Sequence, residues 1–582
     1  MLKLFRYLKN YKLQSILGPL FKLTEACFEL AVPIVMAQII DIGIANNDTD
    51  YIIGKGMILI LLGVLGLAAS LTAQFFAARA SLGFGTDLRR DLFKHINTFS
   101  HKEIDKLGSS TLVTRLTVDV NQAQTGINML LRLFLRSPFI VVGAVIMAFT
   151  ISVKLTLIFL IASPLLATMI FLVMKLTVPL YKKIQNRLDK TTLMVSENIA
   201  GVRVIRAFSR QKDEERAFRE NADELLALQQ KASRISVLTN PCTYLIVYAA
   251  ITVIIWFGGI NVNIGGITQG ELIALISYMN QILLALLAVA LLVTSLTRAQ
   301  ASSHRINEVF DIKSSVTDDG NTAVADDENA PAVSFRNVYF SYSGNNEYAL
   351  KDLTFTADRG ETIGVIGGTG CGKSTLVELI PRFYDADKGS IRIFGEDVSD
   401  YPFSQLRGRI GFVPQKAELF RGTVRENMQY RMKNASDDEI TEALDIAQAL
   451  SFVSDFPKKL DHMIISGGKN LSGGQRQRLT IARALVGKPD ILILDDSASA
   501  LDLATDAALR KALRDKTAGM TVFIVSQRVS SIRYADKILV LDDGELAGIG
   551  THEELLGSCG VYKEICQSQH YLERGEGAAA DV

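Results

Sequence analysis

A glycine-rich turn near residue 370 has the residue types and spacing that bind phosphate. The segment TIGVIGGTGCGKSTLVELI, from residue 362, reads as a strand, a turn and a helix, and it fits the spacing GxxxxGK[ST]. In this pattern backbone N–H groups surround phosphates, the lysine reaches the terminal phosphates, and the hydroxyl binds Mg²⁺. The residues therefore predict a nucleotide site built from Gly367, Gly368, Thr369, Gly370, Cys371, Gly372, Lys373, Ser374 and Thr375.

Two adjacent carboxylates follow a second apolar run. The stretch ILILDDSASALD, residues 491–502, reads as a buried parallel strand that ends at Asp495 and is followed at once by Asp496. Ligands bind at the carboxyl ends of such strands, so Asp495 is placed to hold the magnesium of the nucleotide. The alternative, an aspartate that only caps a turn, suits a lone acid better than one downstream of a phosphate loop.

A second anion-binding helix start lies between these two segments. LSGGQRQRLTIARALV, from residue 471, places Ser472, Gly473 and Gly474 at the beginning of a helix, where free amides and the helix dipole attract an anion. A serine N-cap alone would explain Ser472 but not the two glycines. Because the phosphate loop already holds one nucleotide, this second site predicts a head-to-tail pair of chains with two nucleotides between them.

The elements that carry these motifs belong to a chain with a membrane part. The 582 residues are 48% hydrophobic, with a mean hydropathy of +0.23, and every apolar run of bilayer length lies in the first three hundred residues. About 20 apolar residues suffice to cross the hydrocarbon core. The runs predict six spans, near 15–44, 53–80, 130–151, 154–178, 237–261 and 270–297.

The distribution of basic residues orients these spans and separates the domains. Lys and Arg cluster in two long connections, 81–129 and 179–236, which the positive-inside rule places in the cytoplasm with both termini, and whose patterning predicts helices that extend beyond the bilayer. We expect a multi-pass protein of the plasma membrane. The expected order is a transmembrane domain over 1–310, an acidic linker over 311–331, a soluble domain over 332–570 and a tail over 571–582.

Charge and cysteine content exclude two other classes of protein. The chain has 62 basic and 61 acidic residues, so it carries no general electrostatic footprint for nucleic acid. Its five cysteines are scattered, without a CxxC pair. We therefore expect neither a disulfide framework nor a zinc site.

Taken together, the motifs resemble those of the ATP-binding cassette (ABC) exporters. GGTGCGKST, Gln415 in FVPQ, LSGGQ and ILILDDSASALD occur in this order behind six spans. The resemblance implies an all-α six-helix transmembrane domain followed by an α/β P-loop nucleotide-binding domain, with ATP and Mg²⁺ as cofactors. It also implies that Tyr342 stacks on adenine, that Gln415 senses magnesium, and that Asp502 communicates across a dimer. The signature that would serve the partner's ATP comprises Leu471, Ser472, Gly473, Gly474 and Gln475.

Two positions depart from the family pattern in one nucleotide site. The family usually has glutamate after the magnesium-binding aspartate, where this chain has Asp496, and a histidine against the γ-phosphate, where this chain has Gln527. A shorter carboxylate misplaces the water-polarising group, and glutamine cannot carry a positive charge. The coincidence favours a degenerate site in one half of a heterodimeric exporter, whose partner has the competent site. A slow homodimeric exporter and an ATP-gated channel or regulatory subunit stay open as alternatives.

Further expectations concern coupling and substrate. Segments near 107–118 and 200–211 resemble the family's coupling helices, and Ser466 stands where exporters often have a glutamate. In the first span, Glu25 and Glu29 share a helix face with Lys22. They either line a wet cavity for a small amphipathic molecule or lipid, or they are neutralised by pairing, with Lys22 or with the other possible partners, Arg132 and Arg136.

Overall fold

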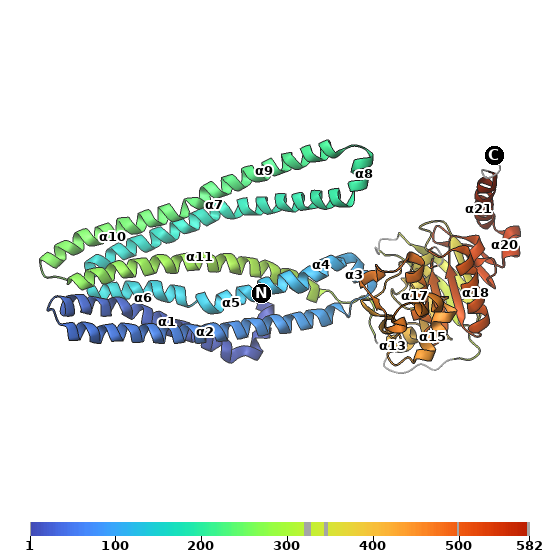
Figure 1. The fold of residues 1–582 in the computed structure, drawn as a ribbon, viewed down its shortest axis with the longest axis horizontal. Coiled ribbons are helices and arrows are strands. Elements are labelled where there is room, and N and C mark those ends of the chain that lie inside the picture. The colour runs from blue at the N-terminus through green and yellow to red at the C-terminus, as the bar shows by residue number, and fades with distance from the viewer. Residues whose placement is uncertain (1, 319–326, 343–346, 498–499, 579–582) are drawn as a thin grey trace. The chain divides into compact units, whose positions relative to one another are not determined.

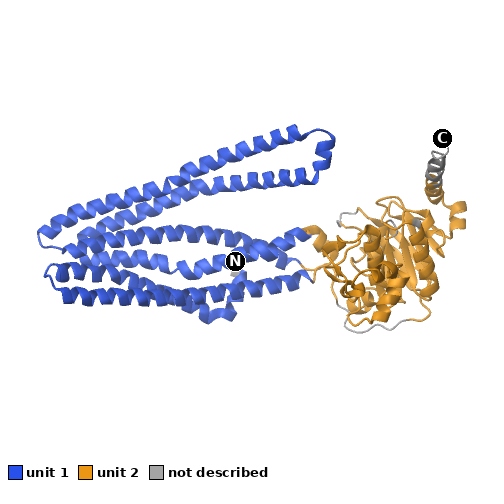
Figure 2. Ribbon diagram, in the orientation of Figure 1, with its two compact units in different colours: residues 1–97, 109–312 blue, residues 98–108, 313–582 orange. Residues whose placement is uncertain are grey.

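The structure is a computed structural model that describes residues 2–318, 327–342, 347–497 and 500–578. The chain divides into two compact units (Figure 2): unit 1 comprises residues 1–97 and 109–312, and unit 2 comprises residues 98–108 and 313–582. Parts of the expected linker (319–326) and tail (579–582) lie outside the described residues, as do positions 498 and 499 of the ILILDDSASALD stretch.

The described residues of unit 1 form helices joined by short turns (Figure 1). Among the described residues it contains six helical segments that are long and apolar enough to cross a membrane: Lys3–Ile44, Thr49–Ile96, Ser109–Ile151, Val153–Ala200, Gln211–Asn263 and Gln269–Asp311. The individual elements are η1 (Leu2–Tyr11), α1 (Lys12–Gln38), η2 (Ile39–Ile44), α2 (Thr49–Ile96), α4 (Ser109–Thr114), η3 (Arg115–Asp119), α5 (Val120–Leu133), α6 (Arg136–Ile151), α7 (Val153–Ala200), α8 (Val202–Ala207), α9 (Gln211–Val237), α10 (Thr239–Asn263) and α11 (Gln269–Asp311).

Small residues allow the helices of unit 1 to approach closely. On α2, Ala69, Ala73 and Ala77 recur every four residues and are buried, and α2 packs along α1. A Cβ added to Gly18 of α1 would lie 3.3 Å from the backbone nitrogen of Ala77. Such small-residue faces are how helices associate where the lipid leaves no hydrophobic driving force between them.

The longest helices exceed what a bilayer needs. α2 and α7 each have 48 residues, which at about 1.5 Å per residue is roughly 70 Å, against about 30 Å of hydrocarbon. The two connections expected to be helical, 81–129 and 179–236, are helical over most of their length in the structure. Rigid helices of this length can transmit a movement at their ends into the membrane region.

Unit 2 is an α/β unit whose described residues form three sheets. The strand orders are β2-β1-β4-β5, β12-β11-β3-β10-β9-β6 and β7-β8, and in the six-stranded sheet every pair except β11 with β12 is parallel. The strands are β1 (Val333–Phe340), β2 (Leu350–Ala357), β3 (Thr362–Gly367), β4 (Lys388–Ile393), β5 (Glu396–Asp397), β6 (Ile410–Val413), β7 (Gly422–Thr423), β8 (Met463–Ile464), β9 (Ile491–Asp495), β10 (Thr521–Val525), β11 (Lys537–Asp542) and β12 (Glu545–Gly550).

Helices complete unit 2, and several of them, including α12, α17 and α19, pack against strands of the six-stranded sheet. Alternate residues of β9 enter different cores: Ile491 and Ile493 pack with the antiparallel strands, whereas Leu492 and Leu494 pack with the helical part. The helices are α3 (His101–Leu107), α12 (Lys373–Leu379), α13 (Phe403–Arg409), α14 (Val424–Met428), α15 (Asp437–Ile446), α16 (Leu450–Ser454), η4 (Lys459–Asp461), η5 (Ser466–Gly468), α17 (Gly473–Leu485), α18 (Leu503–Lys516), α19 (Val529–Ile532), α20 (His552–Ser558) and α21 (Gly560–Ala578).

Candidate functional site

The phosphate loop connects the end of β3 to the start of α12. Gly372 has φ 95°, and a Cβ there would lie 2.6 Å from Leu350 Cδ2, so both the backbone conformation and the space require glycine. The buried Lys373 donates from Nζ to the carbonyl oxygens of Gly367 at 3.0 Å and Gly368 at 2.5 Å. The loop thus holds the ammonium group of Lys373 within its own concavity, next to the amides at the start of α12.

The residues expected to bind magnesium lie together at the ends of neighbouring elements. Ser374 Oγ donates a hydrogen bond to Asp495 Oδ1 at 3.0 Å. Burial raises the pKa of Asp495, and the charge of Asp496 raises it further. A buried carboxylate beside a hydroxyl is a set of oxygen ligands that suits Mg²⁺, whose charge would offset the cost of burying the carboxylate.

Asp496 stands in a constrained turn beside Gln415. Its φ is 43°, in the left-handed region, and its N–H donates to the carbonyl of Val525 at 3.0 Å. Gln415 Nε2 donates to Asp496 Oδ2 at 3.3 Å. The structure therefore gathers Ser374, Asp495, Asp496 and Gln415 at the carboxyl end of the parallel sheet, where ligands of α/β folds bind.

Tyr342 lies beside the helix that follows the phosphate loop. Its hydroxyl is 2.9 Å from Thr375 Oγ1, and 45% of the residue is exposed. The neighbouring Glu378 was not foreseen from the sequence: burial, with the charges of Asp495 and Asp105, raises its pKa to about 7. In the sequence Glu378 is one more polar position of α12, so its partial burial near the charges of Asp495 and Asp105 is visible only in the structure.

The signature begins helix α17 as a capping box. Ser472 Oγ accepts from the N–H of Gln475 at 3.2 Å, and Gln475 Oε1 accepts from the N–H of Ser472 at 2.9 Å. A Cβ added to Gly473 would meet no atom within 4 Å, and Leu471 is buried beneath the turn. The serine is therefore an N-cap, while the glycine turn above it leaves room for an anion to approach the first amides of the helix.

The remaining predicted positions lie in other loops of unit 2. Asp502 caps α18: its Oδ1 accepts from the N–H of Thr505 at 2.9 Å and its Oδ2 from Thr505 Oγ1 at 2.8 Å. Gln527 lies two residues beyond β10, with an exposed side chain. Ser466 is exposed in the short turn η5.

A short segment of the N-terminal half is part of unit 2. In α3, His101 stacks on Phe383 with ring centroids 4.3 Å apart, and Asp105 accepts a hydrogen bond from the Tyr384 hydroxyl at 2.8 Å. This docked segment, 98–108, mostly precedes the 107–118 stretch expected to couple the domains. Sequence periodicity identifies a helix here but not its contacts, because 279 residues separate Asp105 from Tyr384.

Removing the Tyr384 hydroxyl should loosen this docked segment. Burial and the Asp105 carboxylate raise the pKa of Tyr384, so the phenol stays a donor. Tyr384→Phe removes a hydrogen bond to a charged group, at a cost of about 1.5–3 kcal/mol. We expect faster hydrogen exchange of residues 98–108. Tyr430→Phe, at a ring that is 68% exposed, is the matched control, and equal exchange in both variants would contradict the expectation.

In unit 1 the two candidate cavity acids are paired. Lys22 Nζ lies 2.5 Å from Glu25 Oε2 and donates to Ser70 Oγ at 3.2 Å. Arg136 Nη2 lies 2.7 Å from Glu29 Oε2, and Arg136 Nε lies 3.9 Å from Glu25 Oε1. The cluster joins α1 to α2 and α6 with two positive and two negative charges, so pairing is the interpretation that its geometry favours.

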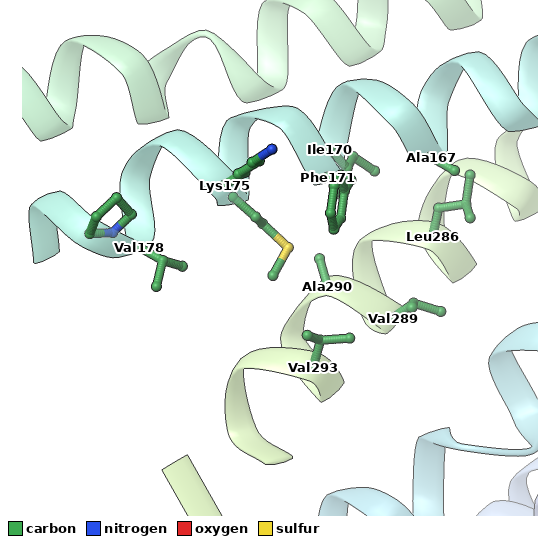
Figure 3. Close-up of a pocket in the computed structure, with 11 residues that line it drawn as sticks. Ala167, Ile170, Phe171, Lys175, Val178, Leu286, Val289, Ala290 and Val293 are labelled. Atoms are coloured by element: carbon green, nitrogen blue, oxygen red, sulfur yellow. The ribbon is translucent and has the colours of Figure 1, made fainter. Parts of the chain in front are cut away.

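A large apolar pocket lies between α7 and α11 (Figure 3). Its volume is about 600 Å³. The close-up shows Phe171 of α7 opposite Ala290 and Val293 of α11. Lys175 is the one charged residue of the lining, which consists of Ala167, Ile170, Phe171, Met174, Lys175, Val178, Pro179, Leu286, Val289, Ala290 and Val293.

Comparison with known proteins agrees with this architecture. Residues 15–286 match the ABC transporter transmembrane region, and residues 350–499 match the family described as ABC transporter. A solved structure of a bacterial Atm1-family ABC exporter with ATP bound superposes with a TM-score of 0.79, covering 97% of this chain and 98% of that chain at 24% identity. The expected fold class, a six-helix membrane unit followed by an α/β ATPase unit, is confirmed.

Relatives extend the match along the whole chain. The uncharacterized ABC transporter ATP-binding protein YfiB of Bacillus subtilis is 38% identical over 99% of this chain and 100% of its own length. The probable multidrug resistance ABC transporter ATP-binding/permease protein YheI of Bacillus subtilis is 35% identical over 84% of each chain. The ATP-dependent lipid A-core flippase of Hahella chejuensis is 31% identical over 96% of each chain. The chain has a multi-pass membrane unit with six candidate spans, joined to an ATPase unit with a phosphate loop. With these matches, it belongs to the ABC transporter family as an exporter half-transporter.

Proposed function

We propose that this chain is one subunit of a heterodimeric plasma-membrane exporter that moves small amphipathic molecules or lipids out of the cytoplasm. Its own ATP site hydrolyses slowly, and its signature completes the competent site of the partner. The observation that carries the proposal is Asp496, which occupies the turn after the magnesium-binding Asp495 with a carboxylate one methylene shorter than glutamate. Gln527, without a positive charge, falls in the same site.

Binding of nucleotide needs no residue that the chain lacks. Lys373 and the loop amides would hold the phosphates of ATP, and Tyr342 would stack on its base. Ser374 and Asp495, together with the Gln415 side chain, would hold Mg²⁺, which when bound neutralises charge on the phosphates. The site therefore keeps its binding groups and differs only in the groups that would activate water.

Exposed apolar surfaces support assembly with a second subunit. At the tip formed by α7 and α8, Ile199 is 72% exposed, Val204 60% and Phe208 75%. This part of the chain lies beyond the length that a bilayer covers, so lipid does not bury these side chains. Exposed apolar patches of this kind mark contacts with another protein. We propose that α8, within the 200–211 segment expected to couple the domains, rests on the ATP-binding unit of the partner.

The substrate class is argued from unit 1 and from the relatives. The α7–α11 pocket offers about 600 Å³ of almost wholly apolar lining with one lysine, which suits an amphipathic molecule. The names of two relatives refer to multidrug resistance and to a lipid A-core flippase, and both are consistent with amphipathic cargo. The charge cluster on α1 adds a second polar feature at membrane depth.

Co-expression tests the heterodimer. The chain should be reconstituted alone and together with a half-transporter encoded beside it, and both preparations assayed for ATP hydrolysis and dye export. The proposal expects rapid turnover and export only with the partner. Full activity of the chain alone would support a homodimeric exporter instead, and ion current without accumulation of substrate would support an ATP-gated channel.

The acidic residues of the first span provide a test of the substrate site. If Glu25 and Glu29 face the substrate, changing either to Gln should weaken export of a cationic dye more than export of a neutral compound, because Arg136 and Lys22 then carry uncompensated positive charge. Glu308→Gln, at the far end of α11, is the control for the loss of one negative charge. Equal losses for both substrates, or none, would leave pairing as the role of the two acids.

A further inference from the structure

The C-terminal helix α21 is anchored in unit 2 by one face. Tyr562 and Cys566 are buried in the core, and Gln569 follows three residues later, so the three side chains share the face that a helix presents at i, i+4 and i+7. The Tyr562 hydroxyl lies 2.7 Å from His552 Nδ1 of α20. These contacts fix the rotation of the helix and turn Gln569 toward the body of the unit.

Gln569 makes one hydrogen bond with the backbone of the loop that contains Gln527 and one with the first residue of α19. Its Nε2 donates to the carbonyl oxygen of Gln527 at 2.7 Å, and its Oε1 accepts from the N–H of Val529 at 2.9 Å. A side-chain amide has one donor and one acceptor side, so it satisfies both backbone groups at once. The loop between β10 and α19 comprises only residues 526–528, so one contact falls at its middle residue, Gln527, and the other at Val529, the first residue of α19.

The held loop is adjacent to the hydrolytic groups. Ser526 donates from its N–H to the carbonyl of Val365 at 3.1 Å, and Asp496 donates to the carbonyl of Val525 at 3.0 Å. The start of the loop is therefore tied to β3 and β9, where the phosphate loop and the two aspartates begin. Its far end is tied to α21 through Gln569, and the Gln527 side chain projects from between these two attachments.

We propose that Gln569 is a positioning residue for ATP hydrolysis. It contacts no nucleotide, but it sets the backbone from which Gln527 reaches toward the γ-phosphate, so that the C-terminal helix controls the hydrolysis rate of this chain's own site. The inference rests on the proposed function in one respect, the action of Gln527 on the nucleotide. The hydrogen-bond geometry of the loop is independent of it.

The test uses the full chain assembled with its partner, with the partner's own site silenced by mutation. Gln569→Ala should accelerate hydrogen exchange of residues 526–530, slow single-turnover hydrolysis about tenfold, and change the Kd for ATP by less than about twofold. Gln569→Glu keeps an acceptor for Val529 but sets a carboxylate against the Gln527 carbonyl, so hydrolysis should slow as well. Gln567→Ala, at an exposed glutamine of the same helix, is the matched control and should behave as wild type.

Separate outcomes judge the two proposals. Thermal unfolding of the 569 and 567 variants at the same temperature confirms that neither is misfolded. The positioning role is overturned if Gln569→Ala shows the same hydrogen exchange of the loop as Gln567→Ala. It is also overturned if Gln569→Ala accelerates hydrogen exchange of the loop but leaves the hydrolysis rate unchanged, while Gln527→Ala lowers that rate. If Gln527→Ala hydrolyses ATP at the wild-type rate, the proposed role of Gln527 is wrong, and loop exchange alone decides whether Gln569 holds the loop.

Discussion

Replacing Ser472 by alanine together with Gly474 by glutamate should abolish most ATP turnover of the assembled exporter. In the structure these residues form the first turn of α17, where a Cβ added to Gly474 would lie 3.4 Å from the carbonyl of Ala500. A glutamate there sets bulk and negative charge at the place where a partner's γ-phosphate would meet free amides. Loss of such anion-stabilising contacts lowers kcat about 100-fold or more.

The contrasting variant acts on this chain's own site. If this chain's own site hydrolyses slowly, as proposed, Asp496→Asn removes a carboxylate that contributes little to turnover, so steady-state turnover should fall by less than about twofold. Asp496→Glu alone should not create a second rapid site, because Gln527 still cannot carry the charge of an imidazolium. The signature variant thus tests the contribution of this chain to the partner's ATP site, and the Asp496 variants test hydrolysis in this chain's own site.

Steady-state ATPase of the purified pair is the measurement, with nucleotide occupancy determined for each variant so that misfolding is not mistaken for lost chemistry. Ser472→Ala alone serves as the milder control, because it removes the capping acceptor for Gln475 without adding charge. If Asp496→Asn silences the pair while the signature variant stays active, this chain is the catalytic partner and the assignment is reversed.

The phosphate loop and the strand that ends at Asp495 could be predicted because their signals are local in sequence. A phosphate loop needs consecutive backbone amides, so GGTGCGKST already contains its site, and a strand that ends in Asp495 places the acid at a known edge of a parallel sheet. The Ser374–Asp495 hydrogen bond follows from these two facts, although 121 residues separate the partners. The six spans were predictable for a similar reason, since bilayer thickness sets their length.

The residues that connect elements could not be predicted in the same way. Asp105 with Tyr384, and Gln569 with the loop of Gln527, pair ordinary polar positions whose own segments carry no motif. Their contacts depend on which helix face meets which loop, and periodicity identifies a face without naming its neighbour. Arg136 could be predicted in part. Its charge in a membrane span indicates that it pairs with an acid, and the structure shows that the acid is Glu29.

The pair should retain close to one ATP molecule in this chain's own site through many turnovers of the other. The binding groups are assembled: Lys373 lies in the phosphate loop, Ser374 reaches Asp495, and Tyr342 stands beside Thr375. The proposed function takes hydrolysis in this site to be slow, because Asp496 and the uncharged Gln527 stand at the two hydrolytic positions of the family. Binding energy that is not matched by stabilisation of the transition state holds substrate without converting it.

Trapped-nucleotide analysis measures this retention directly. The pair is allowed to turn over with labelled ATP, unbound nucleotide is removed rapidly, and the bound nucleotides are separated into ATP and ADP. Lys373→Ala in this chain is the control, since it removes the ammonium that reaches the phosphates and should release the retained ATP. Equal conversion of ATP to ADP at both sites would show that Asp496 supports hydrolysis in spite of its length. In that case the proposal of a slowly hydrolysing site in this chain is wrong.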